Sequence, residues 1–183
     1  LTMVMFTSIA LSRERERGTM EALMVSPCRK WEIIAGKILP YVAVGYLQMM
    51  IILLISHFVF AVPIRGAVLL LASLAAPFIL GNLAVGIAFS TIAKSQQQAM
   101  QLSFFFLLPN ILLSGFMFPF HAMPEPAKVL SQALPLTHFL KISRRVILQN
   151  SAFADVRQEL YWLLAIVFVL CVFASVRFRK KLM

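Results

Sequence analysis

Long apolar stretches separated by shorter polar ones run along the whole chain and predict membrane-spanning helices. Four of these stretches are long enough to cross a hydrocarbon core of ~30 Å at about 1.5 Å per helical residue; they cover residues 38–62, 67–93, 98–118 and 160–176. A shorter apolar stretch, residues 1–11, reaches about half of such a core. We therefore expect an all-α, polytopic membrane helix bundle with four full spans and the end of another, as the C-terminal portion of a longer protein.

The polar connections assign the predicted helix ends to two sides of the membrane. Because each span crosses once, residues 12–37, residues 94–97 and the tail 177–183 share one side, and residues 63–66 and 119–159 share the other. Eleven of the 17 Lys and Arg residues lie on the first side, and short loops rich in these residues stay in the cytoplasm. The pattern predicts a cytoplasmic opening segment and tail, with residues 119–159 on the outer, periplasmic side.

The long connection of residues 119–159 contains two helical patterns, each introduced by a proline: Glu125–Leu134, and Leu136 to about Leu148. In the second pattern Phe139, Ile142, Val146 and Ile147 recur at helical spacing, while Lys141, Arg144 and Arg145 take other positions. This predicts an amphipathic, re-entrant or interfacial helical hairpin. Two interpretations of its basic residues stay open, namely attraction of lipid head groups and simple solvation of one helix face.

The opening segment, residues 12–37, concentrates charge between two apolar stretches, with six Lys or Arg and four Glu. Thr19 can cap a short helix with Glu21 in its first turn. The apolar residues on one face of that helix are Met20, Leu23 and Met24. A second short helix is expected to begin at Pro27, and the chain is expected to turn into the membrane at Gly36.

Topology alone requires positive charge in this segment, but not four glutamates or a stripe of Met and Leu. Mixed charge beside a flexible apolar stripe suits the groove of another protein. A plain amphipathic helix that contacts only lipid has the same pattern. From the residues alone the two interpretations are equally supported.

Composition excludes an ordinary soluble domain. Apolar residues make up 61% and charged residues 13% of the chain, and the mean hydropathy is +0.87, whereas globular proteins are roughly half apolar and a quarter charged. The net charge of +10 does not favour a nucleic-acid partner, because the basic residues flank apolar stretches as topology signals do. The two cysteines and three histidines lie far apart and favour no metal site.

Motifs for ATP binding and for hydrolysis are absent from the sequence. There is no phosphate-binding Gly-x-x-x-x-Gly-Lys-Ser/Thr motif, so ATP would have to be bound by another polypeptide. The spans also lack the buried charges that proton-coupled carriers use. We therefore expect a chain that is not an enzyme and binds no cofactor or metal.

A few polar side chains interrupt the predicted spans and should face protein or a cavity rather than lipid. They are Gln48, Asn82, Gln101 and Asn110, and they suit either helix packing or a translocation path. Asn110 follows Pro109, where the third span is expected to break. In residues 67–93 small side chains recur four positions apart, which predicts tight packing of this helix inside the subunit or at a dimer seam.

Three segments resemble the membrane subunit, or permease, of ABC-2-type exporters. They are Arg15–Leu23 with Pro27 and Gly36-Lys37; Ser114–Pro119 leading to Met123-Pro124-Glu125; and Leu134–Phe139 followed by Arg144. The sequence is most similar to bacterial inner-membrane permeases of the drug-resistance type. The resemblance implies a multi-pass protein of the inner membrane, in a six-helix subunit whose first helix and large external domain come before the residues present here.

The resemblance also implies partners and residue roles. A second permease subunit would form the path for a hydrophobic or amphiphilic substrate, such as a drug or a lipid, and cytoplasmic ABC ATPase subunits would bind ATP and Mg²⁺; no nucleic acid is implied. The alternative is a truncated, non-transporting membrane scaffold that recruits a cytoplasmic partner. The residues implied in coupling to the ATPase are Arg13, Glu14, Arg15, Glu16, Arg17, Thr19, Met20, Glu21, Leu23 and Met24. Those of the outer hairpin are Pro119, Pro124, Glu125, Pro135, His138 and Arg144.

Overall fold

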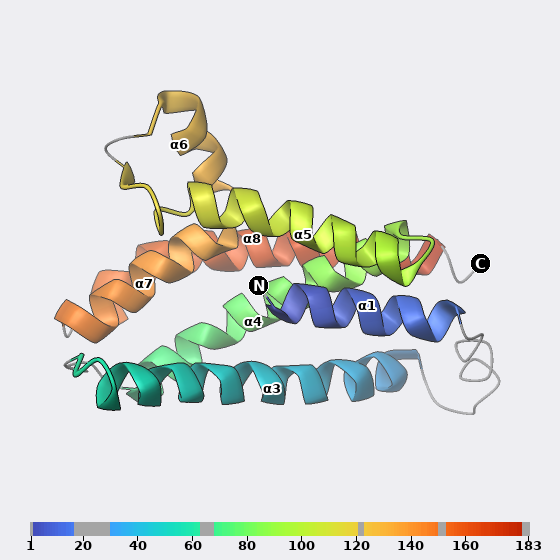
Figure 1. Cartoon of the computed structure of the whole chain (residues 1–183), viewed down its shortest axis with the longest axis horizontal. Helices are drawn as coiled ribbons and strands as arrows, with labels where there is room; N and C mark the ends of the chain where they lie inside the picture. The colour runs from blue at the N-terminus through green and yellow to red at the C-terminus, as the bar shows by residue number, and fades with distance from the viewer. Residues whose placement is uncertain (1, 17–29, 63–67, 121–122, 150–152, 181–183) are drawn as a thin grey trace.

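The computed structural model describes residues 2–16, 30–62, 68–120, 123–149 and 153–180, and all regular structure in these ranges is helical (Figure 1). The predicted all-α class is therefore confirmed for the described residues. The helices are α1 (Thr2–Glu16), α3 (Lys30–Phe58), α4 (Val68–Ile92), α5 (Gln96–Leu113), α6 (Glu125–Gln132), α7 (Pro135–Gln149) and α8 (Phe153–Lys180).

Three of the four predicted full spans correspond to helices that could cross a membrane by their length and composition. Ile38–Phe58 in α3, Val68–Ile92 in α4 and Asp155–Val176 in α8 are long and apolar enough to cross a membrane. The fourth, α5, has 18 residues and opens with three glutamines. At about 1.5 Å per residue it is slightly shorter than a ~30 Å core, so a fourth full crossing is not confirmed.

The prediction for the end of α5 was wrong. The helix continues through Pro109 and ends at Leu113, whereas the apolar pattern predicted a span to residue 118 that breaks at the proline. A proline removes a single backbone donor, and the helix accommodates that loss. The end is set instead by Gly115, whose φ of +83° lies in the left-handed region that favours glycine.

Helices continue through several boundaries that were predicted to interrupt them. Residues 12–16 extend α1, and α3 begins at Lys30 and continues past Gly36, so from Lys30 on there is no separate short helix before Gly36. Likewise α8 begins at Phe153, and the last residues of the predicted 119–159 hairpin belong to it. Residues 12–16 and 153–159 contain no Gly or Pro, so charge alone does not end a helix there.

Pro40 lies inside α3 and does not end it. A proline leaves the carbonyl four residues earlier without its helical donor. For Pro40 that carbonyl belongs to Gly36, which is exposed.

The helix α4 forms the centre of the bundle. It packs against α1 and α8, and also contacts α3, α5 and α7 (Figure 1). Half of its spanning window is buried, against 11% for α3 and 17% for α8. A Cβ atom at Gly81 would lie 2.8 Å from Val167 of α8, and one at Gly86 would lie 2.8 Å from Cβ of Thr7 in α1. The predicted tight packing of this helix within the chain is confirmed.

The helix ends gather at two opposite ends of the bundle (Figure 1). The C-terminal ends of α1 and α8 lie at one end with the α4–α5 connection, and we name it the Gln96 end. The ends of α3 and α7 and the starts of α4 and α8 lie at the other, which we name the α7–α8 end. Which side of the membrane each end faces stays a prediction.

The two helices of the predicted hairpin are confirmed within two residues of their expected ends. Pro124 precedes α6 and Pro135 is the first residue of α7, the position where a missing N–H costs nothing. Ile142 and Val146, two members of the predicted apolar face, are buried. Between the two helices, Ala133 and Leu134 donate their backbone N–H groups to the carbonyls of Leu130 and Ser131, which closes the turn.

Candidate functional site

At the Gln96 end, three polar residues join the charged end of α1 to the start of α5. The Glu16 carboxylate accepts the backbone N–H of Gln96 at 2.8 Å and also a bond from the Gln96 side-chain amide. Arg13 Nε donates to Gln96 Oε1 at 3.3 Å. We name Arg13, Glu16 and Gln96 the Gln96 junction.

The Gln96 junction follows from the chemistry of helix ends. The first N–H groups of a helix have no partner within it, and its positive dipole end attracts carboxylates. Ser95 accepts the N–H of Gln98 at 3.2 Å, while Glu16 of α1 satisfies Gln96. The hydrogen bonds from the Gln96 side chain and backbone lower the pKa of Glu16, and the charge of Arg13 acts in the same direction.

Only part of the predicted coupling motif falls within the described residues. Arg13 and Glu16 belong to the Gln96 junction, and Glu14 is half-buried. Of Arg15 only the backbone is described. Arg17, Thr19, Met20, Glu21, Leu23 and Met24 lie outside the described residues, so their predicted role stays a prediction.

An open groove of about 430 Å³ lies between α1 and α3 beside the Gln96 junction. Arg13, Glu14 and Tyr41 line it together with the apolar residues Phe6, Ile9, Ala10 and Val44. The groove is thus apolar along most of its length and charged where α1 ends.

The polar residues predicted within the spans take three different environments. Gln48 accepts the Thr2 hydroxyl at 3.0 Å and so joins α3 to α1. Asn82 and Asn110 are buried, and each donates to a carbonyl of its own helix, those of Phe78 and Phe106, at 2.8 and 2.9 Å. Gln101 is exposed on α5.

A buried contact between α1 and α5 was missed in the sequence. The hydroxyls of Ser8 and Ser103 lie 2.7 Å apart, and Ser103 also donates to the carbonyl of Ala99 at 2.8 Å. The only signal was that each of two apolar stretches contains serine, which does not reveal that Ser8 and Ser103 face each other. This bond adds a second polar link between the helices that the Gln96 junction connects.

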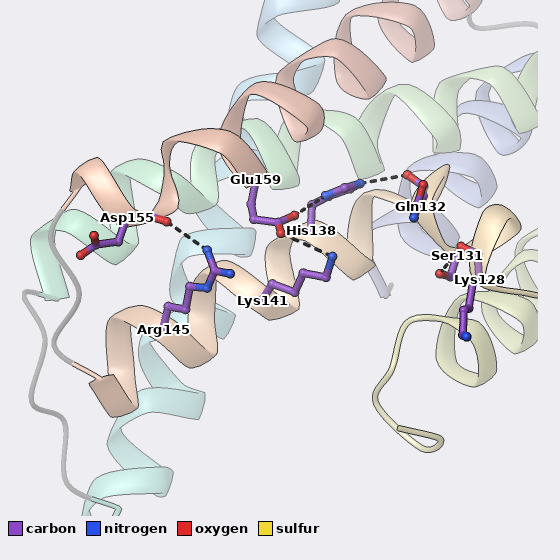
Figure 2. Close-up of polar contacts among 8 residues, drawn as sticks. All are labelled: Lys128, Ser131, Gln132, His138, Lys141, Arg145, Asp155 and Glu159. Carbon is purple, nitrogen blue, oxygen red and sulfur yellow. Dashed lines mark hydrogen bonds and ion pairs between the residues drawn. The ribbon is translucent and has the colours of Figure 1, made fainter. Parts of the chain in front are cut away.

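A second polar cluster joins α6, α7 and α8 (Figure 2). His138 Nδ1 lies 2.7 Å from Glu159 Oε2, and His138 Nε2 lies 2.9 Å from the carbonyl oxygen of Gln132. Lys141 Nζ lies 3.4 Å from Glu159 Oε1. The side chains of His138 and Glu159 are 4% and 14% exposed. We name His138, Glu159, Lys141 and the Gln132 carbonyl the His138 cluster.

The basic residues of α7 bind protein groups, which neither interpretation of the sequence included. Arg144 donates to the carbonyl of Gly115 at 3.2 Å, and Arg145 donates to the carbonyl of Asp155 at 3.0 Å (Figure 2). Lys141 Nζ also lies 5.2 Å from the centre of the Phe120 ring. Their partners are distant in sequence, so the amphipathic pattern of α7 does not indicate them.

The remaining hairpin residues contribute to local structure. Glu125, in the first turn of α6, pairs with Lys128 at 2.8 Å, but its side chain is 84% exposed, and such a pair adds little stability. Pro119 is exposed.

Among the described residues there is no group of three or more His, Cys, Asp or Glu side chains that is placed to hold a metal ion.

The sequence pattern described as "ABC-2 type transporter" matches residues 1–148. The chain belongs to the ABC-2 type transporter family.

Named relatives in Escherichia coli (strain K12) agree with the ABC-2 assignment. The chain is 33% identical to "Probable multidrug ABC transporter permease YbhR" over 97% of its own length and 48% of that protein. It is 35% identical to "Probable multidrug ABC transporter permease YbhS" over 79% and 39% of the two chains. It is 32% identical to "Inner membrane transport permease YhhJ" over 98% and 48%.

This ABC-2 chain spans about half the length of the relatives YbhR and YhhJ. No solved structure matches it. The family pattern ends at residue 148, near the end of α7, so it includes His138 but not its partner Glu159. The ABC-2 assignment makes the chain part of a transporter's membrane subunit, and it assigns no role to the Gln96 junction or the His138 cluster.

Proposed function

We infer that the chain is the membrane-spanning part of a permease subunit of an ATP-driven exporter in a bacterial inner membrane. The observation that carries this proposal is the ABC-2 match over residues 1–148. Relatives described as multidrug or inner-membrane transport permeases and the helices long enough to span support it. The substrate we propose is hydrophobic or amphiphilic, a drug or a lipid-like molecule. ATP and Mg²⁺ are bound by partner ATPase subunits, and a second permease subunit completes the path.

The orientation we propose places the Gln96 end in the cytoplasm and the α7–α8 end outside. The distribution of Lys and Arg over the predicted connections supports this orientation. The charged end of α1 then faces a cytoplasmic ATPase, with the predicted coupling residues next to it in sequence.

Motion from the ATPase would enter the bundle through α1. Glu16 holds both the backbone N–H and the side-chain amide of Gln96, so a displacement of the end of α1 acts directly on the first residue of α5. Ser8 and Ser103 connect the same two helices deeper in the bundle. Close contact at Gly86 makes α4 follow α1. We propose that α1, α4 and α5 move as one unit during transport.

Coupling is tested with the double substitution Glu16→Lys and Glu21→Lys in the full-length protein, reconstituted in vesicles with its ATPase. We expect the protein to insert normally, because the spans are unchanged, while ATP hydrolysis no longer drives substrate accumulation. Glu125→Lys, at an exposed position on α6, is the matched control and should retain coupling. Transport per ATP equal to wild type in the double variant would refute this route.

The non-transporting scaffold is not favoured by the comparisons, because the named relatives are described as permeases. Stoichiometric co-purification of an ABC ATPase, together with ATP-dependent substrate uptake by inside-out vesicles, is expected for the exporter. A bound partner without a nucleotide site, and no uptake, would be expected for the scaffold.

A further inference from the structure

His138 has a hydrogen-bond acceptor in front of each of its ring nitrogens (Figure 2). A neutral imidazole carries one N–H and one bare nitrogen, whereas the imidazolium carries two N–H groups. The Glu159 carboxylate lies 2.7 Å from Nδ1, and the Gln132 carbonyl oxygen lies 2.9 Å from Nε2. In a neutral ring, the lone pair of the bare nitrogen would therefore point at a lone pair of one of these oxygens. Only a ring with both nitrogens protonated satisfies both acceptors.

The alternative place for one of these protons is the carboxyl of Glu159. A protonated Glu159 would donate to Nδ1, and the ring would then be neutral with its N–H at Nε2. The ammonium group of Lys141 lies 3.4 Å from the other oxygen of Glu159, and a nearby positive charge favours the ionised carboxylate. The proton therefore belongs on His138, between a carboxylate and a carbonyl.

The Gln132 carbonyl needs this donor because of the residues that follow it. Gln132 is the last residue of α6, and the carbonyls at a helix end have no partner within the helix. The carbonyls of Leu130 and Ser131 are satisfied by N–H groups of the turn. Three residues after Gln132 stands Pro135, which has no N–H to donate. His138 supplies the donor, and a cation suits the negative end of a helix dipole.

Among the described residues, the charged groups near His138 lie on α6, α7 and α8. On α8, Asp155 and Arg157 lie within the first turns before Glu159. On α7, Lys141 pairs with Glu159, while Arg144 and Arg145 bind backbone carbonyls of other segments. On α6, Glu125 and Lys128 pair with each other. The helices α4 and α5, which also contact α7, contain no Asp, Glu, Lys, Arg or His, so no further ionisable side chain of these helices opposes or replaces the proton.

We propose that His138 is a positioning residue that acts as a proton-held latch, fastening the end of α6 to α8 through Gln132 and Glu159. With the proton bound, the imidazolium bridges the two helices. When the proton leaves, one of the two bonds is lost, because the remaining N–H serves either Glu159 or Gln132 and the bare nitrogen repels the other acceptor. The latch is thus closed at lower pH and opens as pH rises. Its placement on the outer side of the membrane rests on the proposed function.

Trp162 reports the state of the latch. Its ring stacks on the His138 ring, with centroids 6.5 Å apart and an interplanar angle of 18°, and an imidazolium quenches indole fluorescence more strongly than a neutral imidazole. The measurement uses the purified full-length protein in nanodiscs, with Trp162 as its only tryptophan. We expect fluorescence to rise as pH rises through the opening of the latch, and the rise to be absent in His138→Gln.

Two further variants distinguish loss of the His138 proton from a general effect of pH on the fluorescence. Glu159→Gln removes the ionic partner and should move the fluorescence rise to lower pH. Arg145→Met, whose bond goes to the Asp155 carbonyl, is the matched control and should leave the midpoint unchanged. A midpoint that is the same in wild type and Glu159→Gln would overturn the proposal, as would a rise that persists in His138→Gln.

The opening itself is measured as a distance. Gln132 and Tyr161 are exposed on α6 and α8, so cysteines at these positions carry nitroxide labels once Cys28 and Cys171 are replaced by Ala. We expect a narrow distance distribution at low pH, broadening over the pH range of the fluorescence rise, and a broad distribution at every pH in His138→Gln. A distribution that is independent of pH and of His138 would refute the latch. Neither measurement needs ATPase or transport, so either result is independent of whether the chain is part of an exporter.

Discussion

The helices α1 and α4 approach each other closely at Gly86, and this contact leads to a quantitative prediction for Gly86→Ala. An added Cβ would lie 2.8 Å from Cβ of Thr7 and 2.9 Å from the carbonyl oxygen of Val4. The optimal distance between carbon atoms is about 3.5–4.0 Å, so α1 and α4 would have to separate by roughly 0.7–1.2 Å. Neither contact can be relieved by rotating a side chain, because one atom is a backbone oxygen and the other is bonded directly to the backbone.

The free energy of this clash is estimated by comparison with Gly36→Ala. Overpacking of this kind costs about 1–3 kcal/mol, while replacing Gly by Ala inside a helix stabilises by roughly 0.5–1 kcal/mol. Gly36 has nothing within 4 Å of the Cβ position, so Gly36→Ala keeps the gain without the clash. We expect Gly86→Ala to be less stable than Gly36→Ala by about 1–3 kcal/mol.

The assay is equilibrium unfolding of the purified protein in mixed micelles of mild detergent and dodecyl sulfate, followed by far-UV circular dichroism. Both variants are measured against wild type, and both change the same chemical group in a helix. Equal stability of Gly86→Ala and Gly36→Ala would mean that α1 and α4 do not approach each other at Gly86. The central place of α4 in the bundle would then be wrong.

Two other contacts of α1 lead to further predictions. The bonds from Gln96 lower the pKa of Glu16 below its ordinary value of 4.5, so the Gln96 junction is complete at neutral pH and is lost as pH falls through that lowered pKa. The amide NMR signal of Gln96 should shift in this pH range. A Glu16→Gln variant in which the signal still shifts would contradict the assignment. Removal of the buried hydroxyl pair in a double-mutant cycle of Ser8→Ala and Ser103→Ala should give a coupling energy of about 0.5–1.5 kcal/mol, measured by the same unfolding assay, whereas strictly additive losses would mean that the bond contributes nothing.

The confirmed predictions concern properties that depend on neighbours in the sequence. Apolar length identified the spans in α3, α4 and α8, because a bilayer requires about 20 apolar residues in a helix. The prolines before α6 and at the start of α7, together with the spacing of Ile142 and Val146, located the hairpin helices. The recurrence of small residues in α4 predicted close approach, because only small side chains let helix backbones come near each other.

The wrong predictions concern where helices end. The helices α1 and α8 extend beyond the predicted span limits at residue 12 and before residue 160, because a helix continues wherever its residues favour it, whether or not lipid surrounds it. The apolar pattern predicts a break at Pro109 and a span to residue 118, whereas α5 continues through the proline and ends at Leu113, just before Gly115 with its left-handed backbone. The length of an apolar stretch indicates whether a helix can cross the membrane, but it does not indicate where the hydrogen-bonded helix ends.

The sequence by itself determined the helical class, three of the spans, the hairpin and the family. Each of these follows from the pattern of residues close together in the sequence or from the spacing of motifs. Only the tertiary structure decided which polar groups meet. Glu16 and Gln96 are 80 positions apart, and His138 and Glu159 are 21 apart. Whether such residues touch depends on how helices cross and which faces they present, and that is set by packing around α4 rather than by any residue's immediate neighbours.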